Sequence, residues 1–372
     1  MRRRQRIYLG MAIIVLALVG VRIALPYWIA DELNQRLDTM GDYHGHLESV
    51  DLSIYRGAYQ IYDLRIEKRG GKVPVPLLVA PAIDLSVSWR EIFNGAFVAE
   101  VEFQHPELSF VDGGDGKEGQ AGGGVDWRQQ LEALLPIRMN EVRVVDGVVA
   151  FRNLNSDPPV DLRMTDVDLA IRNLTNVRDA KGRRDATLDG RGVVLEDAPA
   201  EFHAGFDPLG KLDDFRFDMR VTGIKLTRLN SFTKAYANLD IARGHGDFVL
   251  ELDADGRRLT GYAKPLLHEL DIFSWKQDVE NGDGNPLQVV WEALSDGITK
   301  LFRNHPENQF ATRIPIEGSL DQPGTSTWSI IVGILRNAFV EAYRSQFEGT
   351  DIERPKHRED QDDEGKRDGA KP

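Results

Sequence analysis

The chain has 372 residues and a formal net charge of −13, and 41% of its residues are hydrophobic. It contains no cysteine, which excludes disulfide bonds, thiol catalysis and cysteine-ligated metal sites. Beyond the amino terminus no basic block is interleaved with aromatic residues, and this argues against nucleic-acid binding, because a phosphate-binding surface needs clustered Lys and Arg.

The amino terminus predicts a membrane anchor. Four arginines within the first six residues precede an apolar stretch, residues 7–25, in which Arg22 is the only charge. A helix of this length rises about 28 Å, close to the hydrocarbon thickness of a bilayer. We therefore predict a single transmembrane helix over residues 1–25, with Ile7, Leu16 and Leu25 at its start, middle and end. The positive-inside rule leaves the arginines in the cytoplasm and exports the rest of the chain.

A cleaved signal peptide is the alternative for this segment. Cleavage needs small residues at an A-x-A-like site, whereas Trp28, Ile29 and Ala30 place a bulky ring at the critical spacing. The apolar stretch is also longer than the usual core of a signal peptide. The sequence therefore favours an anchor that is retained.

After the anchor the apolar residues change their period. From Pro26 onwards they recur every three or four residues, which predicts a helix that continues the anchor. After His46 the period becomes two, as in Leu85, Val87 and Trp89 and again in residues 215–221, which predicts half-buried strands. Asp255-Gly256 lies between two apolar runs and predicts a tight hairpin turn. Antiparallel meanders are the expected arrangement.

One apolar pattern occurs twice, at an offset of 41 residues, and each copy changes its parity once. The change falls at His105-Pro106 in the first copy and at Asp146-Gly147 in the second. One extra residue at a β-bulge would return both halves of each copy to the same face of a sheet. The apolar residues of the two copies are Val101, Phe103, Leu108 and Phe110, and Val142, Val144, Val149 and Phe151.

Residues 26–350 are expected to form one exported β domain. Residues 113–124 form a glycine-rich loop within it, and Asp126 begins a short helix. Two amphipathic helices are predicted near the carboxyl side, over residues 285–302 and 327–347. Residues 351–372 are almost devoid of apolar side chains and predict a disordered charged tail.

The sequence offers no convincing catalytic or metal-binding motif. His44 and His46 lie close together, but two imidazoles without a third ligand do not make a metal site. His268-Glu269 begins like the zinc-protease helix motif, but Ile272 stands where the second histidine belongs. We therefore expect a protein that is not an enzyme, with no catalytic residues, no metal and no cofactor.

Taken in chain order, the motifs resemble those of the AsmA-like family of Gram-negative envelope proteins, in particular its shorter, uncharacterised members. The resemblance covers residues 8–347 and depends on the order of the motifs, because each motif alone is loose. After the anchor come LESVDLS (47–53), SWREIF (88–93), PELSF (106–110), DW (126–127), GVVAF (147–151) and IEGSLDQP (316–323).

The resemblance implies a mainly β fold with a few helices, in which a long curved antiparallel sheet forms an apolar groove. The eight apolar residues of the repeated pattern would line that groove. Larger relatives are thought to carry phospholipid between the two membranes. A protein anchored in the inner membrane, with its main domain in the periplasm, would then bind or transfer phospholipid or another acyl-chain lipid and support envelope homeostasis. The alternative is a non-enzymatic scaffold with a sealed core that binds another envelope protein through its sheet.

Overall fold

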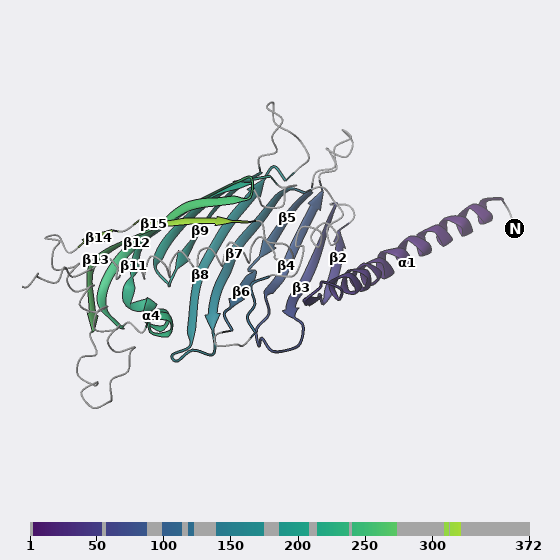
Figure 1. Ribbon diagram of the computed structural model, residues 1–372. Coiled ribbons are helices and arrows are strands. Elements are labelled where there is room, and N and C mark those ends of the chain that lie inside the picture. Colours follow the sequence, from purple (N-terminus) through teal and green to yellow (C-terminus); the bar gives the residue numbers. More distant parts are fainter. Residues whose placement is uncertain are drawn as a thin grey trace, which may run out of the picture.

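The computed structural model describes residues 3–53, 57–87, 99–113, 118–122, 139–174, 186–207, 214–237, 240–273, 309–311 and 313–320. Fifteen strands join in one sheet, which curves strongly toward its last strands (Figure 1). The mainly β character predicted from the period-two patterns is confirmed. The strands are β1 (Tyr43–His46), β2 (Ser49–Ser53), β3 (Ala58–Lys68), β4 (Leu78–Val87), β5 (Ala99–Gln104), β6 (Glu107–Val111), β7 (Met139–Asn153), β8 (Val160–Arg172), β9 (Ala186–Val194), β10 (Ala198–Phe206), β11 (Phe215–Lys225), β12 (Asp240–Asp255), β13 (Arg258–Phe273), β14 (Gln309–Ala311) and β15 (Ile314–Ser319).

The sheet follows the chain order along most of its length. The path runs β1-β3-β4-β5-β7-β8-β9-β10-β11-β12-β13-β14, while β2 pairs with β3, β6 pairs with β4 and β7, and β15 pairs with β13. At about 4.8 Å per strand this path spans about 50 Å. The meander predicted from the hairpin signals accounts for nearly all of these neighbours.

The prediction of a wholly antiparallel sheet is wrong at one place, because β5 and β6 both pair with β7 in parallel. The physical reason is the connection between β6 and β7, residues 112–138, which is long enough for the crossover that parallel neighbours need. The two copies of the repeated pattern therefore lie side by side. Each residue pairs with its counterpart 41 positions later: Val101 with Val142, Phe103 with Val144, Leu108 with Val149, and Phe110 with Phe151.

The two predicted bulges are confirmed. His105 between β5 and β6 and Asp146 in β7 have positive φ angles of 51° and 53°, and the register of β7 shifts between Val144 and Gly147. Asp63 in β3 and Asp166 in β8 have φ angles of 52° and 50°. Asp tolerates this left-handed conformation better than most residues. The register also shifts in β8 between Thr165 and Asp168, so irregularities on the neighbouring strands β7 and β8 keep the apolar side chains on one face.

The predicted hairpin turn joins β12 to β13. Asp255 pairs with Arg258, so the two residues of the turn are Gly256 and Arg257, both with positive φ angles of 53° and 69°. Such angles match the type I′ turn that fits the twist of an antiparallel pair. The turn is therefore one residue further along the chain than the Asp255-Gly256 pair alone indicates.

The first helix, α1 (Arg3–Leu37), is continuous and includes Pro26, so the predicted extension of the anchor segment is confirmed. It extends away from the sheet on the side of β2 and β3 (Figure 1). Its last turns are fixed to the sheet, because Leu33 and Leu37 are buried there and the side chain of Asn34 both donates to and accepts from the backbone of Leu47. Of the helices in the described ranges, none combines the length and apolarity needed to cross a membrane.

Two further elements lie between β11 and β12: the short 3-10 helix η2 (Leu226–Leu229) and helix α4 (Asn230–Ala237). In Figure 1 α4 lies at one end of the strands, near β8 and β11. The helices predicted from Asp126, over 285–302 and over 327–347, and the charged tail 351–372, lie outside the described residues. The same is true of half of the glycine-rich loop 113–124.

Candidate functional site

The eight predicted groove residues lie on one face of the sheet, because their cross-strand partners are one another and the apolar residues of β4 and β8. Phe103 and Leu108 pair with Ile83 and Leu78 of β4, on the two sides of the first bulge. On β8 the partners of Val142, Val144, Val149 and Phe151 are Ile171, Leu169, Met164 and Leu162. The bulges therefore place both halves of each copy on the same face, as the sequence pattern predicted.

The apolar face continues through the remaining strands. Phe202 of β10 pairs with Met219 of β11, which pairs with Leu250 of β12, which in turn pairs with Ala263 of β13. The alternation of side chains along each strand therefore places one uninterrupted apolar surface across the sheet. Many of its large side chains are only half-buried, namely Leu162, Met164, Leu169, Leu188, Phe217, Met219 and Phe248.

The opposite face carries charged side chains that pair between strands. Arg143 lies 3.3 Å from Glu100, Arg172 lies 2.9 Å from Asp189, and Arg216 lies 3.1 Å from Asp253. These pairs are largely solvent-exposed, so each contributes at most about 1 kcal/mol. Their main consequence is that the two faces differ in polarity along the whole sheet.

Asp168 connects this charged face to the bulge in β7. Its carboxylate accepts the backbone N–H of Asp146 at 3.2 Å and a guanidinium N–H of Arg191 at 3.0 Å. The first of these bonds and then the second hold the pKa of Asp168 below its ordinary value. A lowered pKa in the folded state means that the carboxylate stabilises the fold at neutral pH, and that this contribution is lost as the pH falls below about 4.

We expect Asp168→Asn to lower the free energy of unfolding by about 1 kcal/mol at pH 7, because the side chain is solvent-screened and its bonds are modest. Urea unfolding at pH 7 and pH 3 measures this, and the difference from the parent protein should be smaller at pH 3. Arg191→Ala, which keeps the bond from the bulge, should cost less. An effect of Asp168→Asn that is as large at pH 3 as at pH 7 would contradict this role.

The last turns of α1 pack against β1 and β2, at the edge of the sheet where the apolar face begins. Val101 is 1% exposed and belongs to a core that also contains Leu33, Leu37 and Met40, with Phe103 and Leu108 packed against it. The exposed part of α1 lies before this contact. Leu16 is 70% exposed, whereas Leu25 packs against the core, and the side chain of Ile7 lies outside the described residues.

Phe151 is covered by α4, which sequence reasoning missed. The ring of Phe232 lies 6.3 Å from the ring of Phe151 in an edge-to-face arrangement, and the ring of Tyr236 lies 6.4 Å from it. Such aromatic pairs stabilise by about 1 kcal/mol beyond the area they bury. The spacing of Leu229, Phe232 and Tyr236 by three and four residues is a helical signal that could have revealed this element.

A buried polar cluster lies behind Phe151, on the opposite face. Arg152 donates to the hydroxyl of Ser109 and to the carboxylate of Glu107, both at 2.7 Å. The amide of Gln120 donates to the carbonyl oxygen of Ser109 at 3.0 Å. The cluster fixes residues 118–122 to β6 and β7, so we assign it a structural role. The side-chain oxygen of Gln120 is buried there without a hydrogen-bond partner among the described residues.

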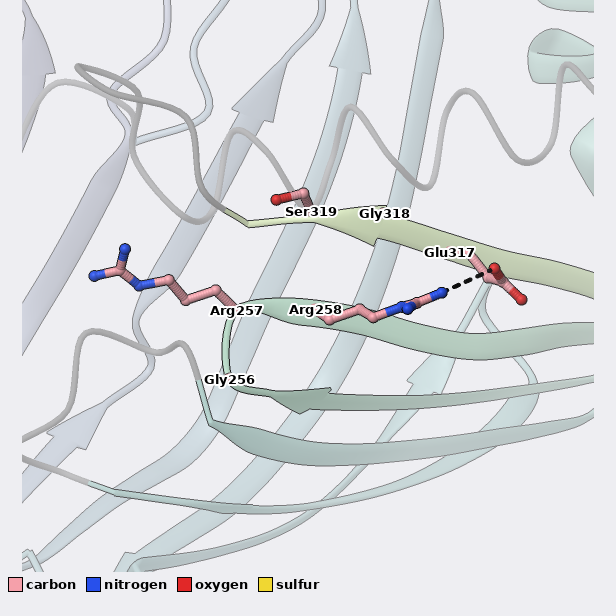
Figure 2. A pocket seen from close by; sticks show the side chains of 6 residues that line it. All are labelled: Gly256, Arg257, Arg258, Glu317, Gly318 and Ser319. Atoms are coloured by element: carbon pink, nitrogen blue, oxygen red, sulfur yellow. Dashed lines mark ion pairs between the residues drawn. The ribbon is translucent and has the colours of Figure 1, made fainter.

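A surface hollow of about 520 Å³ lies at the turn between β12 and β13, beside β15. Figure 2 shows Arg258 directed toward Glu317, 3.8 Å away, and Arg257 directed away from it. The two side chains of this pair are 74% and 68% exposed. The hollow is thus an open polar recess separate from the apolar face.

The titratable groups that are buried near the apolar face are tyrosines. Burial raises the pKa of Tyr59 to about 12, and it also raises the pKa of Tyr43, whose hydroxyl accepts the N–H of Gly122. Both stay neutral at physiological pH and do not act as bases. Within the described ranges no three His, Asp or Glu residues converge as metal ligands.

No protein-family model matches the chain, and no curated protein matches it either. The site must therefore be interpreted from its own residues, and its principal feature is the continuous, partly exposed apolar face.

Proposed function

We propose that the protein binds phospholipid or another acyl-chain lipid on the apolar face of its sheet, and that the exposed apolar surface of the amino-terminal part of α1 attaches it to the inner membrane, with the sheet in the periplasm. The order of the motifs that resemble the AsmA-like family supports the same proposal. Lipid transfer by the protein would contribute to envelope homeostasis.

The observation that carries the proposal is the half-buried centre of the apolar face. Large side chains such as Leu169, Phe217 and Phe248 keep part of their surface exposed, although the same face is sealed at Val101. An acyl chain gains about 0.8 kcal/mol for each methylene that it buries against such side chains. A chain of lipid length can therefore be held without a catalytic residue or a directional bond.

The surface of α1 supports the membrane anchor. Its amino-terminal two-thirds presents large apolar side chains to the surroundings, and Tyr27 and Trp28 follow them at the position where the helix approaches the sheet. Tyr and Trp are enriched at membrane interfaces. The exposed apolar residues include Met11, Ile13, Ile14, Val15, Leu16 and Ile23.

Photocrosslinking from neighbouring residues of β11 tests the lipid proposal. Photoreactive side chains at Phe217 and Met219 face the apolar surface, while the same probe at Asp218 and Arg220 faces the charged surface. We expect phospholipid adducts from the first two positions at about ten times the yield of the other two. Irradiation in isolated membranes, followed by mass spectrometry of the purified protein, measures this ratio.

The matched positions also separate lipid binding from a scaffold function. Equal lipid yields from all four positions would mean non-specific contact with the bilayer and would reject the proposal. Adducts only to protein at Phe217 and Met219 would reject it as well, and would favour the scaffold that binds another envelope protein. Retention of the protein in the membrane after carbonate washing tests the anchor independently.

A further inference from the structure

The connection between β11 and β12 is far longer than their pairing requires. Lys225 and His245 are paired residues of these antiparallel strands, and a hairpin between such strands needs only a few residues. The chain instead forms η2 and α4 before it returns at Asp240. The excursion places α4 against β8 and β12. It therefore has a function beyond joining two strands.

One end of this excursion is firmly fixed to β12. Leu226 is 4% exposed, and its methyl groups lie 3.1 Å and 3.6 Å from the positions that a Cβ would take at Gly244 and Gly246. The amide of Asn230 donates to the carbonyl oxygen of Ile241 at 2.9 Å, and the N–H of Ile241 donates back to Asn230 at 2.8 Å. These two bonds take the place of the backbone hydrogen bonds that a neighbouring strand would make with Ile241.

The other end is held by an ion pair of Lys234 with Asp240, at 2.9 Å, and by the side chain of Tyr236. The hydroxyl of Tyr236 donates to the carboxylate of Asp112 at 2.5 Å and accepts the amide N–H of Asn153 at 3.0 Å. Asp112 follows β6 and Asn153 ends β7, so these bonds join α4 to the two parallel strands that carry Phe110 and Phe151. Tyr236 is 44% exposed, so water has access to this contact.

We propose that α4 is a strap, pivoted at Asn230 and latched by the Tyr236 hydroxyl, that controls access of lipid to the part of the apolar face around Phe151. This inference rests on the proposed lipid binding. With the latch closed, the rings of Phe232 and Tyr236 occupy the space above Phe151. With the latch open, the same rings become part of an enlarged apolar surface for an acyl chain.

Tyr236→Phe tests the strap because it removes the latching hydroxyl and keeps the ring. The matched control is Tyr262→Phe, since the hydroxyl of Tyr262 also bonds a carboxylate, that of Glu251, but on the charged face. A photoreactive phenylalanine replaces Phe151 in each background, and the probe at Phe217 provides the reference. We expect Tyr236→Phe to raise the lipid yield at position 151 between about threefold and tenfold relative to position 217. Tyr262→Phe should leave the ratio unchanged.

Amide hydrogen exchange of the full chain provides a second readout that needs no lipid. Tyr236→Phe and Asp112→Asn should both accelerate exchange in residues 230–237 about tenfold, with no change in residues 248–255. Unchanged exchange in α4 overturns the strap. Faster exchange together with lipid at position 217 but an unchanged yield at position 151 also overturns it. Absence of lipid at position 217 in every variant overturns lipid binding itself, and with it the role given to the strap.

Discussion

Leu37→Ala should lower the free energy of unfolding of the sheet by about 3 kcal/mol, the typical cost of a buried Leu-to-Ala change that leaves a cavity. Leu37 is completely buried where α1 ends, and its side chain lies within 3 Å of the position that a Cβ at Gly45 would take. The side chain of Leu37 therefore fills the space next to Gly45, and its truncation leaves a cavity there. Urea unfolding in detergent, followed by circular dichroism in the β region, measures the loss.

Leu16→Ala is the control, because it makes the same chemical change in the same helix. Leu16 is exposed on the part of α1 that precedes the sheet contact, so its truncation should change sheet stability by less than about 0.5 kcal/mol. If both variants destabilised the sheet equally, α1 would pack on the β domain along its whole length. If neither did, the end of α1 would not be part of the core.

The attachment of α1 has a further consequence for the proposed anchor. Arg69, in the connection after β3, donates to the carbonyl oxygens of Asp38, Gly41 and Tyr43 just beyond the end of the helix. Asp38 and Gly41 lie in the turn between α1 and β1, and Tyr43 begins β1, so Arg69 fixes this turn to the end of β3. The helix thus joins the sheet through several bonds as well as a core, and the anchor and the apolar face are parts of one connected structure.

The period-two pattern predicted both the strands and the two bulges, because both follow from which side of a strand each residue faces. A change of parity at His105-Pro106 would have exposed Leu108 and Phe110 on the charged face unless one residue was left unpaired. The structure contains the extra residue with the expected result. The alternation of apolar and polar residues was therefore sufficient to predict the two faces of the sheet.

The parallel pairing of the repeated patterns could not be predicted from spacing. Equal spacing in residues 101–110 and 142–151 is compatible with distant strands and with direct neighbours, in either direction. The connection between β6 and β7 is long enough to permit parallel pairing, but its length does not require it. Sequence patterns report the face of a residue, but they do not report which strand lies beside it.

The location of the candidate site was predicted better than its accessibility. All eight predicted residues share one face, but Val101 is buried in a core to which the end of α1 contributes, and Phe151 is covered by α4. The half-buried residues on β8 to β12 emerge only from the fold, because burial depends on what lies above each side chain. Phe217 and Met219 of β11 are two such half-buried residues.

Gly190→Ala should lower the free energy of unfolding by about 2–3 kcal/mol through overpacking of the apolar face. Gly190 pairs directly with Phe202, and a Cβ at position 190 would lie 2.2 Å from the ring of that residue. Phe202 is itself only 7% exposed, so the ring has little room to move. The ring of Phe202 thus occupies the space that a side chain at position 190 would need.

Gly205→Ala, on the strand that carries Phe202, separates this clash from the general effect of replacing glycine. A Cβ at Gly205 meets nothing within 4 Å, so the change should be neutral or stabilise by about 0.5 kcal/mol. Combining Gly190→Ala with Phe202→Leu should recover about 1 kcal/mol relative to the sum of the two single changes, because the smaller side chain removes the overlap. Simple additivity in urea unfolding would show that the ring does not occupy the space above Gly190. On the apolar face around β9 and β10, the ring of Phe202 therefore lies over Gly190, between the larger side chains of β8 and β11.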